Sequence, residues 1–322
     1  MARLPIPPST EVEGFLLEFS MNVRALIALI GWSLGLLIGV MGSVPVAYAD
    51  FPMSFENKGR LVTVKKAPQK VLTFGVPAAE IMAALDLGPV VMGRIHNREG
   101  LWPEYEAALK AVPKIAGPDQ ITQEIVQGAD FFFGSFPPSA QELSWDWLPV
   151  YVLEPGSFED LYQRIRDIGQ IFEVEERAET VLAKLNDQLY QTTRRVQNYE
   201  PVKTIVYDPR ADGLYVCGGT DFESRLVSLA GGVNVFADRP EWSKVTAAEI
   251  LDREPEAIVL VQYGDKAPEL KTADLKADPI LSKLMAVTNN KILVLDLEAL
   301  ESGLRAGLTV AVLAKFFHPS LF

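Results

Sequence analysis

The segment EERAETVLAKLNDQLYQTTRRVQN (175–198) predicts one long helix, because it contains neither glycine nor proline and its apolar residues have helical spacing. Ala178, Leu182, Leu185 and Leu189 recur at intervals of three or four residues, which is typical of a helix with one apolar face. Such a helix is about 36 Å long, the length of a whole lobe. Pro201 ends it. We expect a rigid helix that joins two lobes.

Residues 50–156 are predicted to form an amino-terminal α/β lobe. Short apolar runs predict strands at 71–74, 90–92, 131–133 and 151–153. Helical patterns at 77–85 and 121–127 lie between them. Strands that alternate with helices along the chain favour a parallel sheet.

Residues 157–200 are predicted to connect the lobes, and residues 201–322 to form a carboxy-terminal α/β lobe. Ser157 is suited to cap a helix that runs to about Phe172, ahead of the helix at 175–198. In the second lobe, strands are predicted at 204–207, 214–216, 258–261 and 292–295, and helices at 221–230, 246–252, 280–285 and 304–317. The predicted fold is α/β, with two Rossmann-like lobes, one spanning helix and a ligand cleft between the lobes.

Two segments of the sequence share one pattern, here called the internal echo, which favours two related lobes. The segments ITQEIVQGADFFFGS (121–135) and TAAEILDREPEAIVLVQYG (246–264) both run from a short helix through an acidic turn to an apolar strand. We expect the two strands to occupy equivalent places in their lobes.

The amino terminus has the pattern of a secretory signal peptide, predicted over residues 1–49. The apolar run ALIALIGWSLGLLIGV (25–40) follows Arg24 and precedes the small-residue end Ala47-Tyr48-Ala49. Met21 is an alternative start, which would make residues 1–20 an upstream extension. An uncleaved anchor in the inner membrane is the other interpretation, because the run approaches the roughly 20 residues that span a bilayer. No cysteine lies near the cleavage point, so we expect a periplasmic protein that is not a lipoprotein.

The composition favours binding over catalysis. A net charge of −12 repels phosphate backbones and argues against nucleic-acid binding. One cysteine, Cys217, and two histidines, His96 and His318, are too few for a disulfide framework, a cysteine zinc cluster or a multi-histidine site. The chain also has no G-x-S-x-G sequence of a serine hydrolase. We therefore expect a protein that is not an enzyme, has no intrinsic cofactor and is a monomer.

Six segments, in their order and spacing, resemble the siderophore/vitamin B12 class (class III) of periplasmic substrate-binding proteins of ABC importers. The resemblance covers residues 69–319 and includes LAGGVNVF (229–236) ahead of a loop with a tryptophan. It implies two lobes, one spanning helix, little hinge motion, no catalysis and delivery of a ligand to a permease. The segments are KVLTFGVPAAEIMAALDLGPVVMGR (70–94), GADFFFGS (128–135), PVYVLEPGSFEDLYQRIRDIGQIF (149–172), DGLYVCGGTDFESRLVSLAGGVNVFAD (212–238), EWSKVTAAEILDREPEAIVLVQYG (241–264) and ADPILSKLMAVTNNKILVLD (277–296).

Seven arginine and aromatic residues are candidates for ligand binding. A ferric siderophore is large and often anionic or aromatic, so its pocket needs a fixed positive charge and stacking area. The candidates lie at strand ends or in loops: Arg94, Trp102, Phe136, Tyr215, Trp242, Tyr263 and Arg305. Each also has a structural interpretation, such as a surface arginine, a lid over the core or a packed strand residue. His96 is interpreted as an exposed loop histidine rather than a metal ligand, and no metal site is predicted.

The resemblance also implies one surface glutamate in each lobe that pairs with permease arginines. Counted back from Asp130 and Glu256, the usual positions hold Thr122 and Ala248. The neighbouring Glu124 and Glu249 are the candidate docking residues. The alternatives are two solvated glutamates without a role, or a protein that has lost importer docking.

The expected function is that of a periplasmic solute-binding component of an ABC importer, with a ferric siderophore or a similar Fe(III) chelate as ligand. A cobalamin or haem carrier of the same fold is one alternative, and a scaffold or interaction protein without a transport role is another. Pocket aromatics stack equally on catecholates, corrins and porphyrins, so the residues alone do not choose the chelate.

Overall fold

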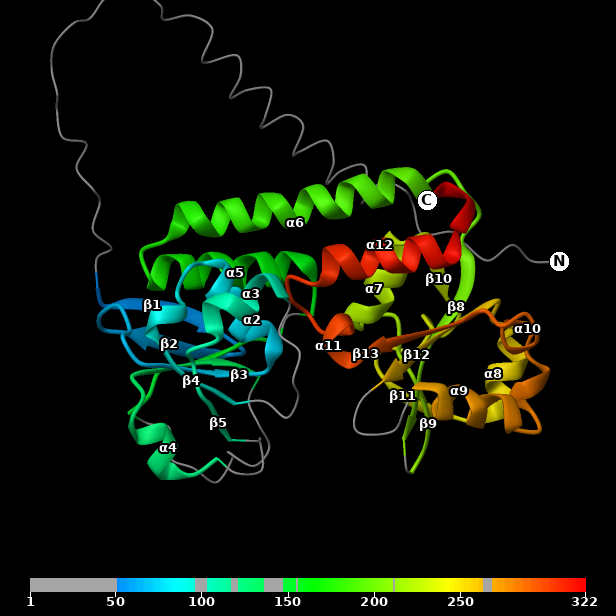
Figure 1. The fold of residues 1–322 in the computed structure, drawn as a ribbon, viewed down its shortest axis with the longest axis horizontal. Helices are drawn as coiled ribbons and strands as arrows, with labels where there is room; N and C mark the ends of the chain where they lie inside the picture. Colours follow the sequence, from blue (N-terminus) through cyan, green and yellow to red (C-terminus); the bar gives the residue numbers. More distant parts are fainter. Residues whose placement is uncertain are drawn as a thin grey trace, which may run out of the picture. The chain divides into compact units, whose positions relative to one another are not determined.

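A computed structural model describes residues 51–95, 103–116, 121–135, 147–154, 156–210, 212–262 and 268–322 of the chain. These residues belong to one compact unit, Tyr48–Phe322, which contains two separate α/β sheets and a two-stranded hairpin. Figure 1 shows helices packed around both sheets. The predicted signal peptide at 1–49 lies outside the described residues.

The first sheet is parallel throughout, as predicted, in the order β5-β4-β3-β6-β7. Phe131, Phe132 and Phe133 of its inner strand β6 are completely buried, because both faces of a parallel sheet are covered. Strand β5 and helices η1 and α3 were not predicted. The elements are β3 (Val71–Phe74), α2 (Val76–Ala84), η1 (Gly88–Val90), β4 (Val91–Ile95), α3 (Pro103–Leu109), β5 (Lys114–Ala116), α4 (Gln123–Gln127), β6 (Phe131–Gly134) and β7 (Val150–Val152).

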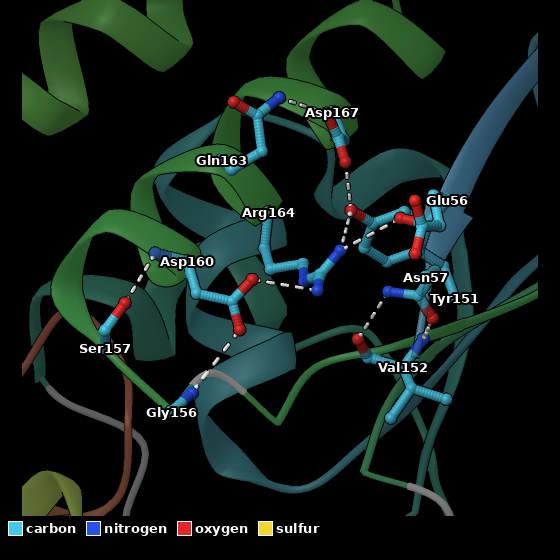
Figure 2. A network of polar contacts seen from close by, with 10 residues as sticks. All are labelled: Glu56, Asn57, Tyr151, Val152, Gly156, Ser157, Asp160, Gln163, Arg164 and Asp167. Atoms are coloured by element: carbon cyan, nitrogen blue, oxygen red, sulfur yellow. Dashed lines mark hydrogen bonds and ion pairs between the residues drawn. The ribbon is translucent and has the colours of Figure 1, made fainter. Parts of the chain in front are cut away.

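An antiparallel hairpin of β1 (Met53–Asn57) and β2 (Arg60–Val64) was also not predicted. The buried side chain of Asn57 donates to the carbonyl oxygen of Val152 at 3.0 Å and accepts from its N–H at 2.7 Å. Figure 2 shows this pairing beside Arg164, which donates to the carbonyl oxygen of Glu56 and to the hydroxyl of Tyr151. The hairpin is thus held by contacts between residues about a hundred positions apart.

The predicted spanning helix is α6 (Glu175–Val196), and it follows α5 (Phe158–Ile171). Near its start, Arg177 donates to the carbonyl oxygen of Leu85, which follows α2 of the first lobe. Near its end, Thr193 donates to the carbonyl oxygen of Leu229, in a helix of the second lobe. Ser157 caps α5 as predicted, since its Oγ accepts from the N–H of Asp160 at 3.0 Å. The long helix therefore contacts both lobes.

The second sheet is mixed, which differs from the expected repeat of the first lobe. Its order is β11-β9-β8-β12-β13, with β10 also paired to β8. Strand β12 is parallel to β8 and β13, whereas β9 is antiparallel to β8 and β11. The strands are β8 (Val202–Arg210), β9 (Gly213–Val216), β10 (Gly232–Asn234), β11 (Ser243–Val245), β12 (Ala257–Gln262) and β13 (Ile292–Asp296).

The helices predicted in the second lobe at 221–230, 246–252 and 304–317 are confirmed, whereas 280–285 is not one helix and the helices at 268–277 and 297–300 were not predicted. Leu284 has ψ of 138°, an extended value that separates the turn η4 from helix α10. Helix α12 packs along α6. The elements are α7 (Phe222–Leu229), α8 (Ala247–Arg253), α9 (Pro268–Ala277), η4 (Leu281–Lys283), α10 (Met285–Thr288), α11 (Leu297–Leu300), α12 (Ala306–Phe317) and η5 (Pro319–Leu321).

The two segments of the internal echo occupy equivalent places, as predicted. Strand β6 lies between β3 and β7, and β12 lies between β8 and β13. The Asp130 carboxylate, just before β6, accepts from the N–H groups of Gln69 and Lys70 at 2.9 and 2.8 Å. The Glu256 carboxylate, just before β12, accepts from the N–H of Lys203 at 3.0 Å. In each lobe one acidic side chain therefore links the segment before β6 or β12 to the start of the neighbouring strand, β3 or β8.

The pairing of Asn57 with β7 predicts a loss of stability in Asn57→Ala. The substitution leaves the buried N–H and carbonyl of Val152 without their partner, so we expect a loss of about 2 to 3 kcal/mol in the free energy of unfolding. Urea denaturation measures it, with the exposed Asn198→Ala as control. Equal midpoints for the two variants would contradict this role.

Candidate functional site

The carboxyl ends of parallel strands are where α/β sheets bind ligands, and the first sheet has tight turns there. Gly134 ends β6 with φ of 145°, and a Cβ at this position would collide with the carbonyl oxygen of Phe74 in β3. Ser135 Oγ donates to the carbonyl oxygen of Leu153 at 3.3 Å. The next segment contains the candidate Phe136, which lies outside the described residues, as do His96, Trp102 and Tyr263.

Arg94 lies within β4 rather than after the strand as predicted. Its Nε and Nη2 donate to the carbonyl oxygen of Val112 at 3.3 and 3.1 Å. The side chain thereby holds the turn that leads into β5. Its role in ligand binding stays a prediction.

The second lobe brings together Tyr215 and Trp242, two of the predicted ligand residues, around Arg210. The guanidinium carbon of Arg210 lies 4.2 Å from the centroid of the Tyr215 ring and 5.6 Å from that of Trp242. Arg210 Nε donates to Asp208 Oδ2 at 2.7 Å. Arginine and two rings thus meet where β8 ends and β9 begins.

Glu223 of α7 completes this group. The indole Nε1 of Trp242 donates to Glu223 Oε1 at 3.4 Å. Burial, with the nearby carboxylates of Asp221 and Glu301, raises the pKa of Glu223 to about 7, although hydrogen bonds from its own backbone N–H and from the Trp242 indole act to lower it. A carboxyl group that titrates near neutrality therefore lies against the tryptophan. We call Arg210, Tyr215, Glu223 and Trp242 the aromatic cluster.

Arg305, the third described candidate of the second lobe, is held by the first lobe. Its Nη2 lies 2.6 Å from Oε1 of Glu80, and its Nε donates to Oε2 at 3.0 Å. Glu80 belongs to α2 and its side chain is 1% exposed. Nearby, a Cβ at Gly303 would lie 3.0 Å from Cβ of Pro77, so the two lobes touch here. The ligand role of Arg305 stays a prediction.

Three of these residues, Glu80, Arg210 and Glu223, were not predicted. A carboxylate inside the apolar run of α2 is itself a signal, because a buried charge needs a partner. Arg210 follows the predicted strand 204–207, and β8 continues to it. Glu223 carries no comparable signal, since an acidic residue in the first turn of a helix is common.

The two candidate docking residues differ in their surroundings. Glu124 is exposed in the first turn of α4, whose N-cap is Thr122. Glu249 forms a capping box with Thr246, the N-cap of α8, and lies 2.7 Å from Arg239. Glu124 is the second residue after its N-cap and Glu249 the third, so the two glutamates do not occupy equivalent positions. Their docking role stays a prediction.

Two features are absent from the described residues. No group of three histidine, cysteine or acidic side chains in these ranges is placed to hold a metal ion. Nor is any helix within them both long and apolar enough to cross a bilayer. His318, the described histidine, lies 3.0 Å from the carbonyl oxygen of Gly231.

Comparisons with known proteins agree on one fold. A family model described as periplasmic binding protein matches residues 77–299. An uncharacterized ABC transporter substrate-binding lipoprotein of Bacillus subtilis is 23% identical, over 84% of this chain and 87% of that protein. A vitamin B12-binding protein of Pectobacterium carotovorum is 22% identical over 64% of this chain and 75% of its own.

A solved structure supports the two-lobed α/β fold. It is titled as an ABC-type Fe3+-hydroxamate transport system from Saccharomonospora viridis, and it superposes with a TM-score of 0.72 at 24% identity. The match covers 83% of this chain and 99% of that one.

The raised pKa of Glu223 predicts a pH-dependent stability. Between about pH 4.5 and 7 the folded protein keeps a proton that the unfolded chain has lost, so this group's contribution to stability falls as pH rises. Glu223→Gln removes the effect, and we expect it to gain on the order of 1 to 2 kcal/mol relative to the unmodified protein from pH 5 to pH 8. Urea denaturation across this range, with the exposed Glu176→Gln as control, measures the gain; parallel profiles for both variants would refute it.

The Arg305–Glu80 pair predicts strong coupling between two mutations. Arg305→Met or Glu80→Met alone leaves one buried charge uncompensated, at a cost of about 3 to 5 kcal/mol. The double variant is expected to cost less than the sum of the two. A double-mutant cycle by urea denaturation measures this, with the exposed pair Arg166–Glu179 as control, where coupling stays under about 1 kcal/mol. Additive costs at the first pair would argue against its role.

Proposed function

Because the chain belongs to the periplasmic binding protein family, we propose that it is the solute-binding component of an ABC importer for a ferric siderophore or a similar iron chelate. Members of this family are substrate-binding transport proteins and not enzymes. Related proteins are named for vitamin B12 or for Fe3+-hydroxamate, both of which are large metal complexes. The proposal assigns this chain a ligand of that kind.

The aromatic cluster is the observation that carries the proposal. It presents two aromatic rings and a guanidinium at the carboxyl end of β8, where such sheets bind ligands. Trp242 is half-buried against the core, which holds its ring in one place. Aromatic faces supply contact area for the organic shell of a chelate, while the metal is already saturated by that shell.

A cobalamin carrier is the second candidate, favoured by the relative that is named a vitamin B12-binding protein. A corrin ring would stack on the same two aromatic side chains. A haem carrier would need an axial protein ligand, and the described histidine His318 already contacts Gly231.

We further propose that the chain is secreted, cleaved after Ala49 and retained in the periplasm. The relative from Bacillus subtilis is named a lipoprotein, and a lipid anchor needs a cysteine at the processed amino terminus. The chain's one cysteine, Cys217, is buried in the second lobe, so we favour a protein without a lipid anchor. Delivery of the chelate to an inner-membrane permease then completes the proposed role.

Titration of the processed protein, from Asp50 onward, tests the ligand. We expect submicromolar quenching of tryptophan fluorescence by a ferric hydroxamate, or by cyanocobalamin if the second candidate holds. Trp242→Leu removes one stacking face and is expected to weaken binding about tenfold. Trp147→Leu, at an exposed residue before the amino end of β7, serves as control. If no ferric chelate, corrinoid or haem quenches the tryptophan fluorescence, the proposed transport function is wrong and the result favours a scaffold role.

A further inference from the structure

Arg210 of the aromatic cluster and the neighbouring Lys244 are each paired with an aspartate outside the cluster. Arg210 donates to Asp208, whose side chain is only 7% exposed, at 2.7 Å. Lys244 lies across the Tyr215 ring, donates to the backbone carbonyl oxygen of Asp212 and is 3.8 Å from its carboxylate. Neither cation therefore adds net positive charge to the surface around Trp242.

Further carboxylates surround the same tryptophan. Glu223 accepts from its indole N–H, and Asp221 and Glu301 act electrostatically on Glu223. Glu241, the exposed residue beside Trp242, acts on Asp221 in the same way. Within the part of the chain that the structure describes, the group around Trp242 thus has more acidic than basic side chains.

The positive charge of Arg210 is already offset by a buried carboxylate, because its Nε–H donates to Asp208. If Arg210 turned to a ligand carboxylate or catecholate, it would leave the buried carboxylate of Asp208 uncompensated. The same holds for Arg305, because its partner Glu80 is 1% exposed. Each of these arginines is thus held by a buried acid and is costly to release.

From this charge balance we propose that the ligand of the aromatic cluster is a metal chelate without net negative charge. The proposal rests on the function proposed above and specifies its substrate class. A neutral or cationic chelate stacks on Tyr215 and Trp242 and leaves both arginine pairs intact. An anionic tris-catecholate or a porphyrin with two carboxylates would be repelled by the acids around Trp242.

Three ferric chelates with one common core test the charge directly. Ferrioxamine B carries a free amine and is cationic, its N-acetyl derivative is neutral, and its N-succinyl derivative is anionic. We expect the anionic chelate to bind at least tenfold more weakly than the cationic one at low ionic strength. The difference shrinks in 0.5 M salt, because salt screens charges that are open to solvent. Tryptophan quenching reports all three dissociation constants.

A charge-reversal variant separates a local effect from the net charge of the whole protein. Glu241→Lys is at an exposed position beside Trp242 and is expected to reduce the preference for the cationic chelate several-fold. Glu176→Lys, on α6, changes the net charge equally and is expected to keep the full preference. An unchanged preference in Glu241→Lys would count against the charge proposal.

The outcomes distinguish this proposal from the function on which it rests. If the succinylated chelate binds as tightly as the cationic one, or if haem binds best, the charge proposal is overturned and the transport function stands. If only cyanocobalamin binds, its monocarboxylate derivative takes the place of the anionic chelate, and weaker binding of that derivative supports the proposal. If nothing in the panel binds, both proposals are overturned.

Discussion

The ion pair between Arg305 and Glu80 joins the two lobes through a buried charge. Glu80 lies inside an apolar helix of the first lobe, and its charge is compensated by an arginine that precedes the last helix of the second. Separation of the lobes at this point would leave the Glu80 carboxylate without its arginine partner, either exposed to solvent or still buried. Contact between Phe158 of α5 and Phe222 of α7, with ring centroids 4.8 Å apart, adds an apolar link. Together with α6, these contacts join the two lobes.

Two arginines are held by buried acids in a similar way. Arginine was expected to attract an anionic siderophore, but in this structure Arg210 and Arg305 each pair with a buried acid. Under the proposed function, affinity would depend more on aromatic contact than on charge attraction. This balance differs from the one that the candidate residues first indicated. The partner of Arg305 lies 225 residues away, whereas the partner of Arg210 lies only two residues away.

Local patterns predicted most of the secondary structure. The helix at 175–198, the cap at Ser157 and the parallel strands of the first lobe follow from periodicity and turn residues, which act over a few positions. The hairpin at 53–64 was not predicted, because it depends on Asn57 meeting Val152. The strand β9 was predicted at 214–216, but its antiparallel pairing was not, because alternation along the chain does not show which way strands pair. Strand β11 was not predicted. The helix predicted at 280–285 was wrong because Leu284 takes an extended conformation.

The candidate site was predictable to the extent that strand ends mark it. Tyr215 and Trp242 were named for their type and position, and the structure places both against Arg210. Arg210 and Glu223 were not predicted, because their place in the site depends on contacts with Tyr215 and Trp242 that the sequence does not show. Glu80 and Arg305 are 225 residues apart, and nothing local indicates that they pair.

Fluorine NMR of the protein labelled with 5-fluorotryptophan tests whether a metal chelate binds against Trp242. The resonance of Trp242 is assigned by its absence in Trp242→Leu, and that of Trp147 in the same way. A neutral ferric trihydroxamate is predicted to broaden the Trp242 resonance beyond detection through its paramagnetic iron, while its gallium analogue only shifts the resonance. Trp147, at the amino end of β7, should keep its signal. An unaffected Trp242 under saturating ferric chelate would contradict the account.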